Sequence, residues 1–338
     1  MKAAIIGLAG PELGADEADL LRRAPPAGVI LFARNITTPA ALHRLVAALR
    51  AILPGEAVLM IDQEGGRVAR LRPPFWREHP PAAALGLVFA RDPAAGRRAA
   101  FLQGALIGAE CAALGLDVVT APVLDLAFPG AHAVIGDRAF GADPGPVATL
   151  GAALAAGLLA AGVQPVMKHI PGHGRATSDS HLTLPVVAQA DLGADFAPFA
   201  ANAGIHGEIP WAMTAHILYP ALDPDRPATL SPTIIKDVIR GAPIGFGGVL
   251  VSDDLAMRAL AGAPGALAIA ALEAGCDLAL HCTGVLAETA AVLEACPAVT
   301  ALAAARLAQA RALAASRRDS RLVADCDDLA AEREGLLA

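Results

Sequence analysis

The chain has 338 residues, of which 55% are hydrophobic and only 4% aromatic, and its formal net charge is −7. A chain of this length can bury a large core without metals or disulfides, and its acidic balance argues against nucleic-acid or anionic-membrane partners. The five cysteines form an odd set without a CxxC pair, which indicates free thiols and a cytoplasmic location.

Short apolar runs alternate with longer helical stretches along the chain. Eight runs are predicted as strands: residues 3–8, 28–33, 57–61, 117–121, 165–168, 211–215, 248–252 and 276–280. Most of them lack polar alternation, as expected for parallel strands covered on both faces. The first run is too short for the apolar region of a signal peptide, so we interpret it as a core strand.

Helix signals separate these strands. Three dipeptides combine an N-cap residue with a proline in the first helical turn: Thr38-Pro39, Asp92-Pro93 and Ser231-Pro232. Further helices are expected over 265–274 and 297–317. The uncharged stretch 144–167 is interrupted by prolines, so we interpret it as a buried helix and a strand rather than a membrane span.

Eight strands separated by helices, without a flexible linker, predict a single (β/α)8 TIM barrel over residues 1–338. A charged helical tail is expected over about 317–338, on the barrel exterior or its floor. An open doubly wound sheet is the alternative fold. No GxGxxG or P-loop motif follows the first strand, which disfavours that alternative.

Polar residues follow nearly every predicted strand. The chemistry of such barrels gathers at the C-terminal strand ends. The residues at these positions are Arg34, Asn35, Asp62, Glu64, Arg67, Asp125, Lys168, His169, His216, Asp253, Asp254 and His281. A single one could be a hydrated strand end, but a whole rim of titratable groups indicates an active site.

The segment KHIPGHGRATSDSH at 168–181 is the densest in such groups. Asp179 lies two residues before His181, so its carboxylate can hydrogen-bond the imidazole and suit it to acid–base catalysis on a mobile loop. A surface loop with a capping aspartate is one alternative. A metal site built from His169, His173 and His181 is another, disfavoured by the positive charge of Lys168.

Two further segments carry candidate carboxylates. Asp253 directly follows the buried run GGVLVS, a position that suits a nucleophile, whereas Asp254 is expected to cap a helix starting near Leu255. In DQEGGRVAR at 62–70, Asp62 could accept hydrogen bonds from paired hydroxyls and the arginines could donate them. A salt-bridged loop is an equal alternative for Glu64 and Arg67.

Six segments together resemble the family 3 glycoside hydrolases, and more narrowly the single-domain bacterial β-N-acetylglucosaminidases of cell-wall recycling. The segments are GVILFARNI at 28–36, IDQEGGRVARL at 61–71, IGDRAF at 135–140, KHIPGHG at 168–174, DSH at 179–181 and GVLVSDDLAM at 248–257. The KHIPGHG motif followed by DSH is the most specific of them.

The resemblance implies a retaining hydrolase with no cofactor and no metal. Asp253 would be the nucleophile, His181 the general acid and then the base, and Asp179 its partner. The sugar would be bound by Asp62, Arg70, Arg138, Lys168 and His169. The implied substrate is a muropeptide with a non-reducing N-acetylglucosamine joined β-1,4 to 1,6-anhydro-N-acetylmuramic acid, and we expect a monomer.

Three alternatives to this function remain open. The first is a family 3 glycosidase that acts on another sugar, such as a β-glucosidase. The second is a non-catalytic sugar-binding barrel, and the third is a metal-dependent barrel hydrolase, which a chelator would inactivate. The presence of Asp179, His181 and Asp253 argues against a non-catalytic binding protein, which would not need all three.

Overall fold

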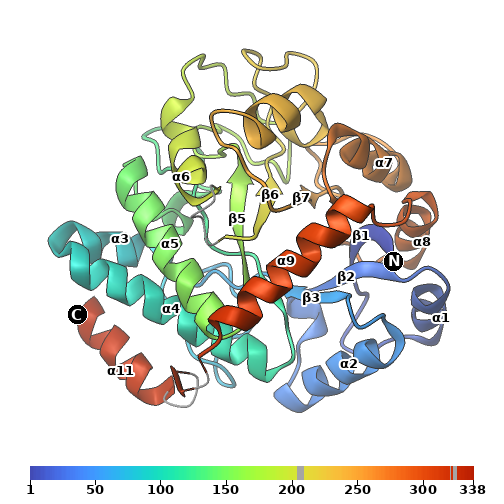
Figure 1. Cartoon of the computed structure of the whole chain (residues 1–338), viewed down its shortest axis with the longest axis horizontal. Helices are drawn as coiled ribbons and strands as arrows, with labels where there is room; N and C mark the ends of the chain where they lie inside the picture. Colours follow the sequence, from blue (N-terminus) through green and yellow to red (C-terminus); the bar gives the residue numbers. More distant parts are fainter. Residues whose placement is uncertain (204–208, 320, 323–325) are drawn as a thin grey trace.

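The computed structural model describes the chain except for residues 204–208, 320 and 323–325. Its strands form a closed parallel barrel in chain order, with β1 paired to β8 (Figure 1). The strands are β1 (Lys2–Gly7), β2 (Pro26–Leu31), β3 (Val58–Ile61), β4 (Val118–Val119), β5 (Gln164–Ile170), β6 (Trp211–Thr214), β7 (Val249–Asp254) and β8 (Leu278–His281). The predicted TIM-barrel fold is thus confirmed.

Helices cover the outside of the barrel. The α-helices are α1 (Ala15–Arg23), α2 (Pro39–Ile52), α3 (Ala82–Arg91), α4 (Pro93–Ala113), α5 (Pro144–Ala160), α6 (Gly193–Ala203), α7 (Pro264–Ala274), α8 (Leu286–Ala295), α9 (Ala301–Arg317) and α11 (Cys326–Leu337). Short 3-10 turns are η1 (Ala33–Asn35), η2 (Gly136–Arg138) and η3 (Ala228–Leu230), and η4 (Ile234–Arg240) is a π-helix. None of the helices described has the length and apolar character needed to cross a bilayer.

The predicted caps begin two of these helices. The Thr38 hydroxyl accepts a hydrogen bond from the Ala41 N–H at the start of α2, and the Asp92 carboxylate accepts two at the start of α4. Each cap satisfies backbone donors that the first helical turn leaves unpaired. A proline at the first position of both helices fits because it has no N–H to satisfy.

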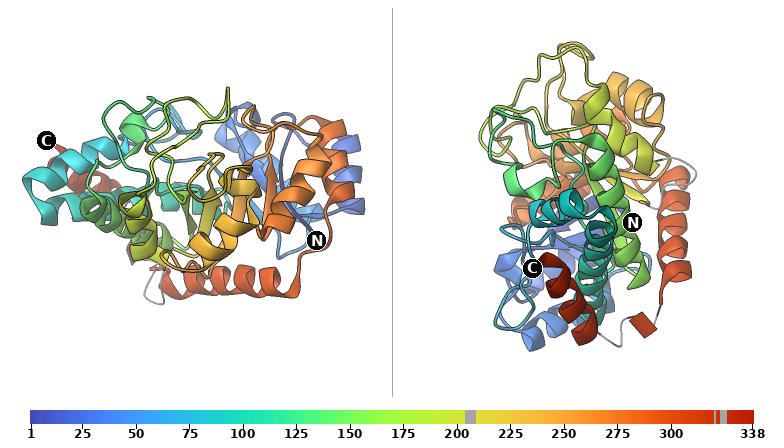
Figure 2. Two further views of the ribbon diagram at one scale, coloured as in Figure 1. Left: turned by 90° about the horizontal axis from the view of Figure 1, so that it is seen from above. Right: turned by 90° about the vertical axis from the view of Figure 1, so that its left-hand side faces the viewer.

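The barrel interior is closed at the N-terminal ends of its strands. There α9 runs beneath the barrel, as the left view of Figure 2 shows. Its Leu307 and Ala310 join the inner cluster that contains Val58, Trp211 and Val249. The opposite mouth, at the C-terminal strand ends, is therefore left for a site.

The register of the strands brings their polar ends to one level. Leu31 of β2 pairs with Ile61 of β3, and Met213 of β6 pairs with Val251 of β7. The residues that follow these pairs therefore emerge around the same mouth.

Several local predictions differ from the structure. The helices α1, α3, α6 and α8 were not among the predicted elements, and β4 holds only two residues. No helix begins near Leu255, so the expected capping role of Asp254 is wrong: Asp254 is still part of β7, and the next helix begins at Pro264. Its Oδ1 instead accepts hydrogen bonds from the N–H groups of Ala256 and Cys282, which ties the end of β7 to the chain after β8.

Candidate active site

A cavity opens at the C-terminal ends of the strands. Its wall includes every predicted site residue except Asp179: Asp62, Arg70, Arg138, Lys168, His169, His181 and Asp253. The same wall also contains Glu64, His173, Ser180, Asp254 and the apolar side chains of Phe32, Met213 and Met257. Half of the predicted rim therefore lines one cavity, namely Asp62, Glu64, Lys168, His169, Asp253 and Asp254. Arg34, Asn35, Arg67, Asp125, His216 and His281 do not line it.

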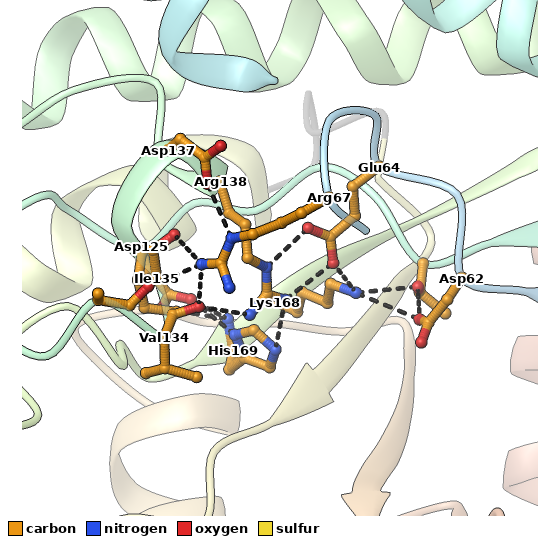
Figure 3. A network of polar contacts seen from close by, with 12 residues as sticks. Asp62, Glu64, Arg67, Asp125, Val134, Ile135, Asp137, Arg138, Lys168 and His169 are labelled. Carbon is orange, nitrogen blue, oxygen red and sulfur yellow. Dashed lines mark hydrogen bonds and ion pairs between the residues drawn. The ribbon is translucent and has the colours of Figure 1, made fainter. Parts of the chain in front are cut away.

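Glu64 is the centre of a buried ion cluster, drawn in Figure 3. Its carboxylate accepts two hydrogen bonds from Arg138, both of 2.8 Å, and its Oε1 lies 2.5 Å from Lys168 Nζ. Burial raises the pKa of Glu64, but the cations of Arg138 and Lys168 lower it overall. Glu64 is thus ionised, and it fixes two of the predicted sugar-binding cations in place.

Asp62 forms a second set of contacts beside this cluster. Arg70 Nη2 donates to its Oδ2 at 2.8 Å, Lys168 Nζ lies 3.4 Å from its Oδ1, and the Thr120 hydroxyl donates to the same oxygen. Burial raises the pKa of Asp62, but the ammonium of Lys168 and the guanidinium of Arg70 bring it well below its usual range. An ionised carboxylate at the cavity wall is a strong acceptor for sugar hydroxyls.

Asp125 orients the histidines of this wall from behind. It is almost fully buried, its Oδ2 lies 2.6 Å from His169 Nδ1, and it also accepts the backbone N–H groups of His169 and His173. Since Nδ1 donates to Asp125, the Nε2 of His169 faces the site, 3.5 Å from Arg138 Nη2. Asp125 was expected among the strand-end residues, but the sequence did not predict that this carboxylate orients His169 and His173.

Asp253 and Asp254 end β7 on the cavity wall. The Asp253 N–H donates to Thr214 Oγ1 at 3.2 Å, and Asp253 Oδ1 accepts the Asp254 N–H at 2.8 Å. Burial raises the pKa of Asp253, but the imidazoles of His216 and His169 lower it overall. Asp253 is therefore an ionised carboxylate held by its backbone in a partly buried position.

His181 stands at the mouth, where 63% of its side chain is exposed. Its Nδ1 and its backbone N–H both lie within hydrogen-bond distance of Asp179 Oδ1, at 2.8 and 2.9 Å. Partial burial raises the pKa of Asp179, but these hydrogen bonds from His181 lower it overall. The predicted pair therefore exists, with an ionised carboxylate on Nδ1 and the opposite ring nitrogen available.

Two contacts hold the loop that carries this pair. Ser180 Oγ lies 3.1 Å from His173 Nε2, and the Ser180 carbonyl accepts the Ala259 N–H at 3.1 Å. Burial and the ring of His169 lower the pKa of His173 to about 4, so its ring is neutral at neutral pH. Ser180 is thereby tied to His173, earlier in the same loop, and to the segment after β7. Neither contact was predicted from the sequence.

The salt-bridged alternative for Glu64 and Arg67 in the 62–70 segment is confirmed. Arg67 forms a surface ion pair with Asp137 at 2.9 Å and also donates to the carbonyls of Val134 and Ile135 (Figure 3). It therefore lies outside the cavity wall and holds the loop that carries Arg138. Glu64 is salt-bridged as well, but inside the site.

The three-histidine metal site has no support among the described residues, where no group of three His, Cys, Asp or Glu side chains is arranged to hold an ion. His169 and His173 instead use ring nitrogens on Asp125 and Ser180. What the arrangement offers is a recessed carboxylate, a cluster of fixed charges and an imidazole–carboxylate pair at the mouth. These are the elements of glycoside hydrolysis.

Comparison with known proteins agrees with this geometry. Residues 5–318 match the glycosyl hydrolase family 3 N-terminal domain. A beta-hexosaminidase of Alkalilimnicola ehrlichii is 44% identical over 284 residues, which are 82% of this chain and 80% of that protein. A beta-hexosaminidase of Methylococcus capsulatus is 42% identical over 85% of this chain and 84% of its own length.

Solved structures give the same relationship. NagZ from Neisseria gonorrhoeae, in complex with N-trifluoroacetyl-D-glucosamine, superposes with a TM-score of 0.85 at 32% identity, covering 100% of this chain and 98% of that one. Beta-N-acetylhexosaminidase from Beutenbergia cavernae gives a TM-score of 0.74 at 33% identity, with 96% of both chains covered. The chain therefore belongs to glycoside hydrolase family 3 and is a β-N-acetylhexosaminidase of the NagZ type.

Proposed function

We propose that this enzyme is a retaining β-N-acetylglucosaminidase that removes the non-reducing N-acetylglucosamine from 1,6-anhydro-N-acetylmuramic acid muropeptides during cell-wall recycling in the cytoplasm. The observation that carries the proposal is the placement of His181, paired with Asp179, at the mouth of the cavity that contains the Asp253 carboxylate. The N-trifluoroacetyl-D-glucosamine bound by the Neisseria NagZ supports an N-acylated glucosamine as the sugar.

In the first step, the Asp253 carboxylate attacks the anomeric carbon and the bond from that carbon to the leaving oxygen breaks. The imidazolium of His181 gives its Nε2 proton to that oxygen, so the aglycone leaves as an alcohol. The product is a glycosyl ester on Asp253 and a neutral His181.

In the second step, neutral His181 takes a proton from water as the water oxygen bonds to the anomeric carbon. The ester bond breaks and Asp253 returns as a carboxylate. Two displacements at one carbon retain the β configuration. Asp179 accepts the Nδ1–H throughout, which keeps Nε2 directed to the reaction and balances the positive charge of the imidazolium.

The fixed charges suit the sugar that these steps require. We propose that Asp62 accepts hydrogen bonds from its hydroxyls, and that Arg138, Lys168, His169 and Arg70 donate to its oxygens. Because Glu64, Asp62 and Asp125 already hold these donors, little side-chain entropy is lost when the sugar binds. No protein partner is needed for the chemistry, and a monomer stays our prediction.

Hydrolysis of the disaccharide N-acetylglucosaminyl-1,6-anhydro-N-acetylmuramic acid, followed by proton NMR, tests this function. We expect the β anomer of N-acetylglucosamine to appear first and activity to persist in a chelator. Initial release of the α anomer would contradict retention. A panel of nitrophenyl glycosides tests the sugar, since preference for glucose over N-acetylglucosamine would favour the β-glucosidase alternative.

A further inference from the structure

The helix α11 lies beyond the part of the chain that matches the family domain, which ends at residue 318. It packs against α4 and α3 on the outside of the barrel (Figure 1). In the sequence it follows all of the cavity residues. Its Arg333 is only 2% exposed, which is unusual for a guanidinium on a terminal surface helix. A cation buried in this way requires specific partners, because desolvation is costly.

The partners of Arg333 are in the segment before α3. Arg333 Nη1 lies 2.8 Å from His79 Nδ1, and Arg333 Nη2 donates to the Glu78 carbonyl at 3.4 Å. A guanidinium can only donate, so His79 Nδ1 accepts, and its Nε2 donates to Glu110 Oε2 at 3.1 Å. Burial lowers the pKa of His79, in agreement with a neutral ring in this arrangement.

His79 in turn holds the loop of residues 62–70. Its carbonyl accepts the Gly66 N–H at 2.8 Å. Gln103 of α4 connects the two segments further, since its Nε2 donates to the Pro80 carbonyl at 2.9 Å and to the Glu64 carbonyl at 3.4 Å. Gly65 has a φ of +106°, and a Cβ there would lie 2.4 Å from the Pro80 carbonyl oxygen. The backbone of this loop is thus fitted closely against residues 79–80.

The residue that precedes these glycines is Glu64, the carboxylate that binds Arg138 and Lys168. We propose that Arg333 is a positioning residue for the sugar-binding site, acting through His79 on the loop that carries Glu64. This inference rests on the proposed roles of Arg138 and Lys168 in binding the sugar. Arg333 itself lines no part of the cavity.

The test compares the full-length chain with Arg333→Met, which fills a similar volume without donors. Glu332→Gln is the matched control, because Glu332 pairs with Arg98 on the exposed side of the same helix. We expect Arg333→Met to raise KM for 4-nitrophenyl N-acetyl-β-glucosaminide about tenfold and to lower kcat less than about twofold, since uniform binding is lost and the chemical groups stay in place. Glu332→Gln should leave both constants at the wild-type values.

A second measurement does not depend on activity. Hydrogen exchange of the peptide over 62–71 should become faster in Arg333→Met and stay unchanged in Glu332→Gln, because the Gly66 N–H loses a fixed acceptor. If Arg333→Met does not fold, Arg333→Lys should raise KM and speed the exchange of residues 62–71 by smaller factors. Unchanged KM, unchanged exchange, or an equal effect of Glu332→Gln would overturn the inference. Absence of wild-type turnover would instead contradict the proposed function alone.

Discussion

Asp253 and Asp254 are neighbours at the end of β7, yet their surroundings shift their proton affinities in opposite directions. Burial raises the pKa of Asp254, whose Oδ1 is occupied by two backbone N–H groups. Burial acts on Asp253 as well, but the imidazoles of His216 and His169 lower its pKa overall. The ionised form that a nucleophile needs is therefore favoured at Asp253.

We predict that Asp253→Asn lowers kcat at least about 10⁴-fold, because an amide cannot form the glycosyl ester. Wild-type enzyme treated with a 2-fluoro glycosyl donor should carry the label on Asp253, located by mass spectrometry of peptides. Circular dichroism should show that Asp253→Asn folds like the wild type. Label on Asp254 would show that the nucleophile is misassigned.

At the scale of elements, the loop after β5 carries Asp179 and His181, the proposed proton-transfer pair, while β7 carries Asp253, the proposed nucleophile. Within this loop, Ser180 contacts His173, and its carbonyl accepts an N–H from the segment after β7. Arg175 gives it a further attachment, since its Nε lies 2.7 Å from Asp195 Oδ2 and its guanidinium stacks on the Phe128 ring. The proposed acid–base group is therefore on a loop fastened by side-chain contacts, whereas the proposed nucleophile is part of a barrel strand.

We predict that His181→Ala slows hydrolysis according to the leaving group. A poor leaving group such as an alkyl alcohol needs protonation, so its kcat/KM should fall about 10²–10⁴-fold. A dinitrophenolate needs little protonation, so kcat/KM for a dinitrophenyl glycoside, which reports the glycosylation step, should fall much less. His43→Ala, an exposed histidine on α2, is the control and should match the wild type. An equal loss for all leaving groups would exclude His181 as the general acid.

The placement of the cavity residues could be predicted from the sequence because it follows from local rules. Apolar runs mark the strands, and the residue after each run must emerge at the barrel mouth. The partners of those residues could not be predicted, because they depend on tertiary distance. Asp125 meets His169 across 44 residues and Arg138 meets Glu64 across 74, and no spacing rule relates such positions.

The misjudged role of Asp254 also has a tertiary origin. Asp254 looks like a helix cap when only its neighbours are considered, since aspartate is a preferred cap. Its Oδ1 is instead used by Cys282, 28 residues later, and β7 continues through it. Contacts between β7 and the chain after β8 thus outweigh the local preference.

At the scale of the whole molecule, the site's ion cluster also links distant parts of the barrel. Glu64 and Asp62 follow β3, Lys168 belongs to β5, and Arg138 lies in the η2 turn. Asp125 likewise joins the segment after β4 to β5. The free energy of unfolding should therefore depend on the ionisation of these carboxylates.

Asp125 shows the sign of this dependence. Burial raises its pKa, but His169 lowers it overall, below the ordinary value of 3.8. As pH falls toward and below 3.8, the unfolded chain takes up a proton that the folded state binds only at lower pH. The stabilisation by Asp125 is thus complete above its unfolded pKa and is lost as pH falls through its folded pKa. Asp254 and Asp195, whose pKa values burial raises, act in the opposite direction.

Comparison with Asp125→Asn isolates this contribution from the opposing groups. Removing the charge of a buried pair should lower the free energy of unfolding at pH 7 by about 3 kcal/mol. Because asparagine does not titrate, the difference from wild type in urea unfolding should stay constant between pH 7 and about pH 5. It should shrink only as pH falls below the ordinary pKa of 3.8. Asp137→Asn, which breaks the exposed pair with Arg67, is the control and should cost less than about 1 kcal/mol at pH 7. A difference for Asp125→Asn that stays constant or grows as pH falls below 3.8 would mean that this carboxylate is not held ionised by His169.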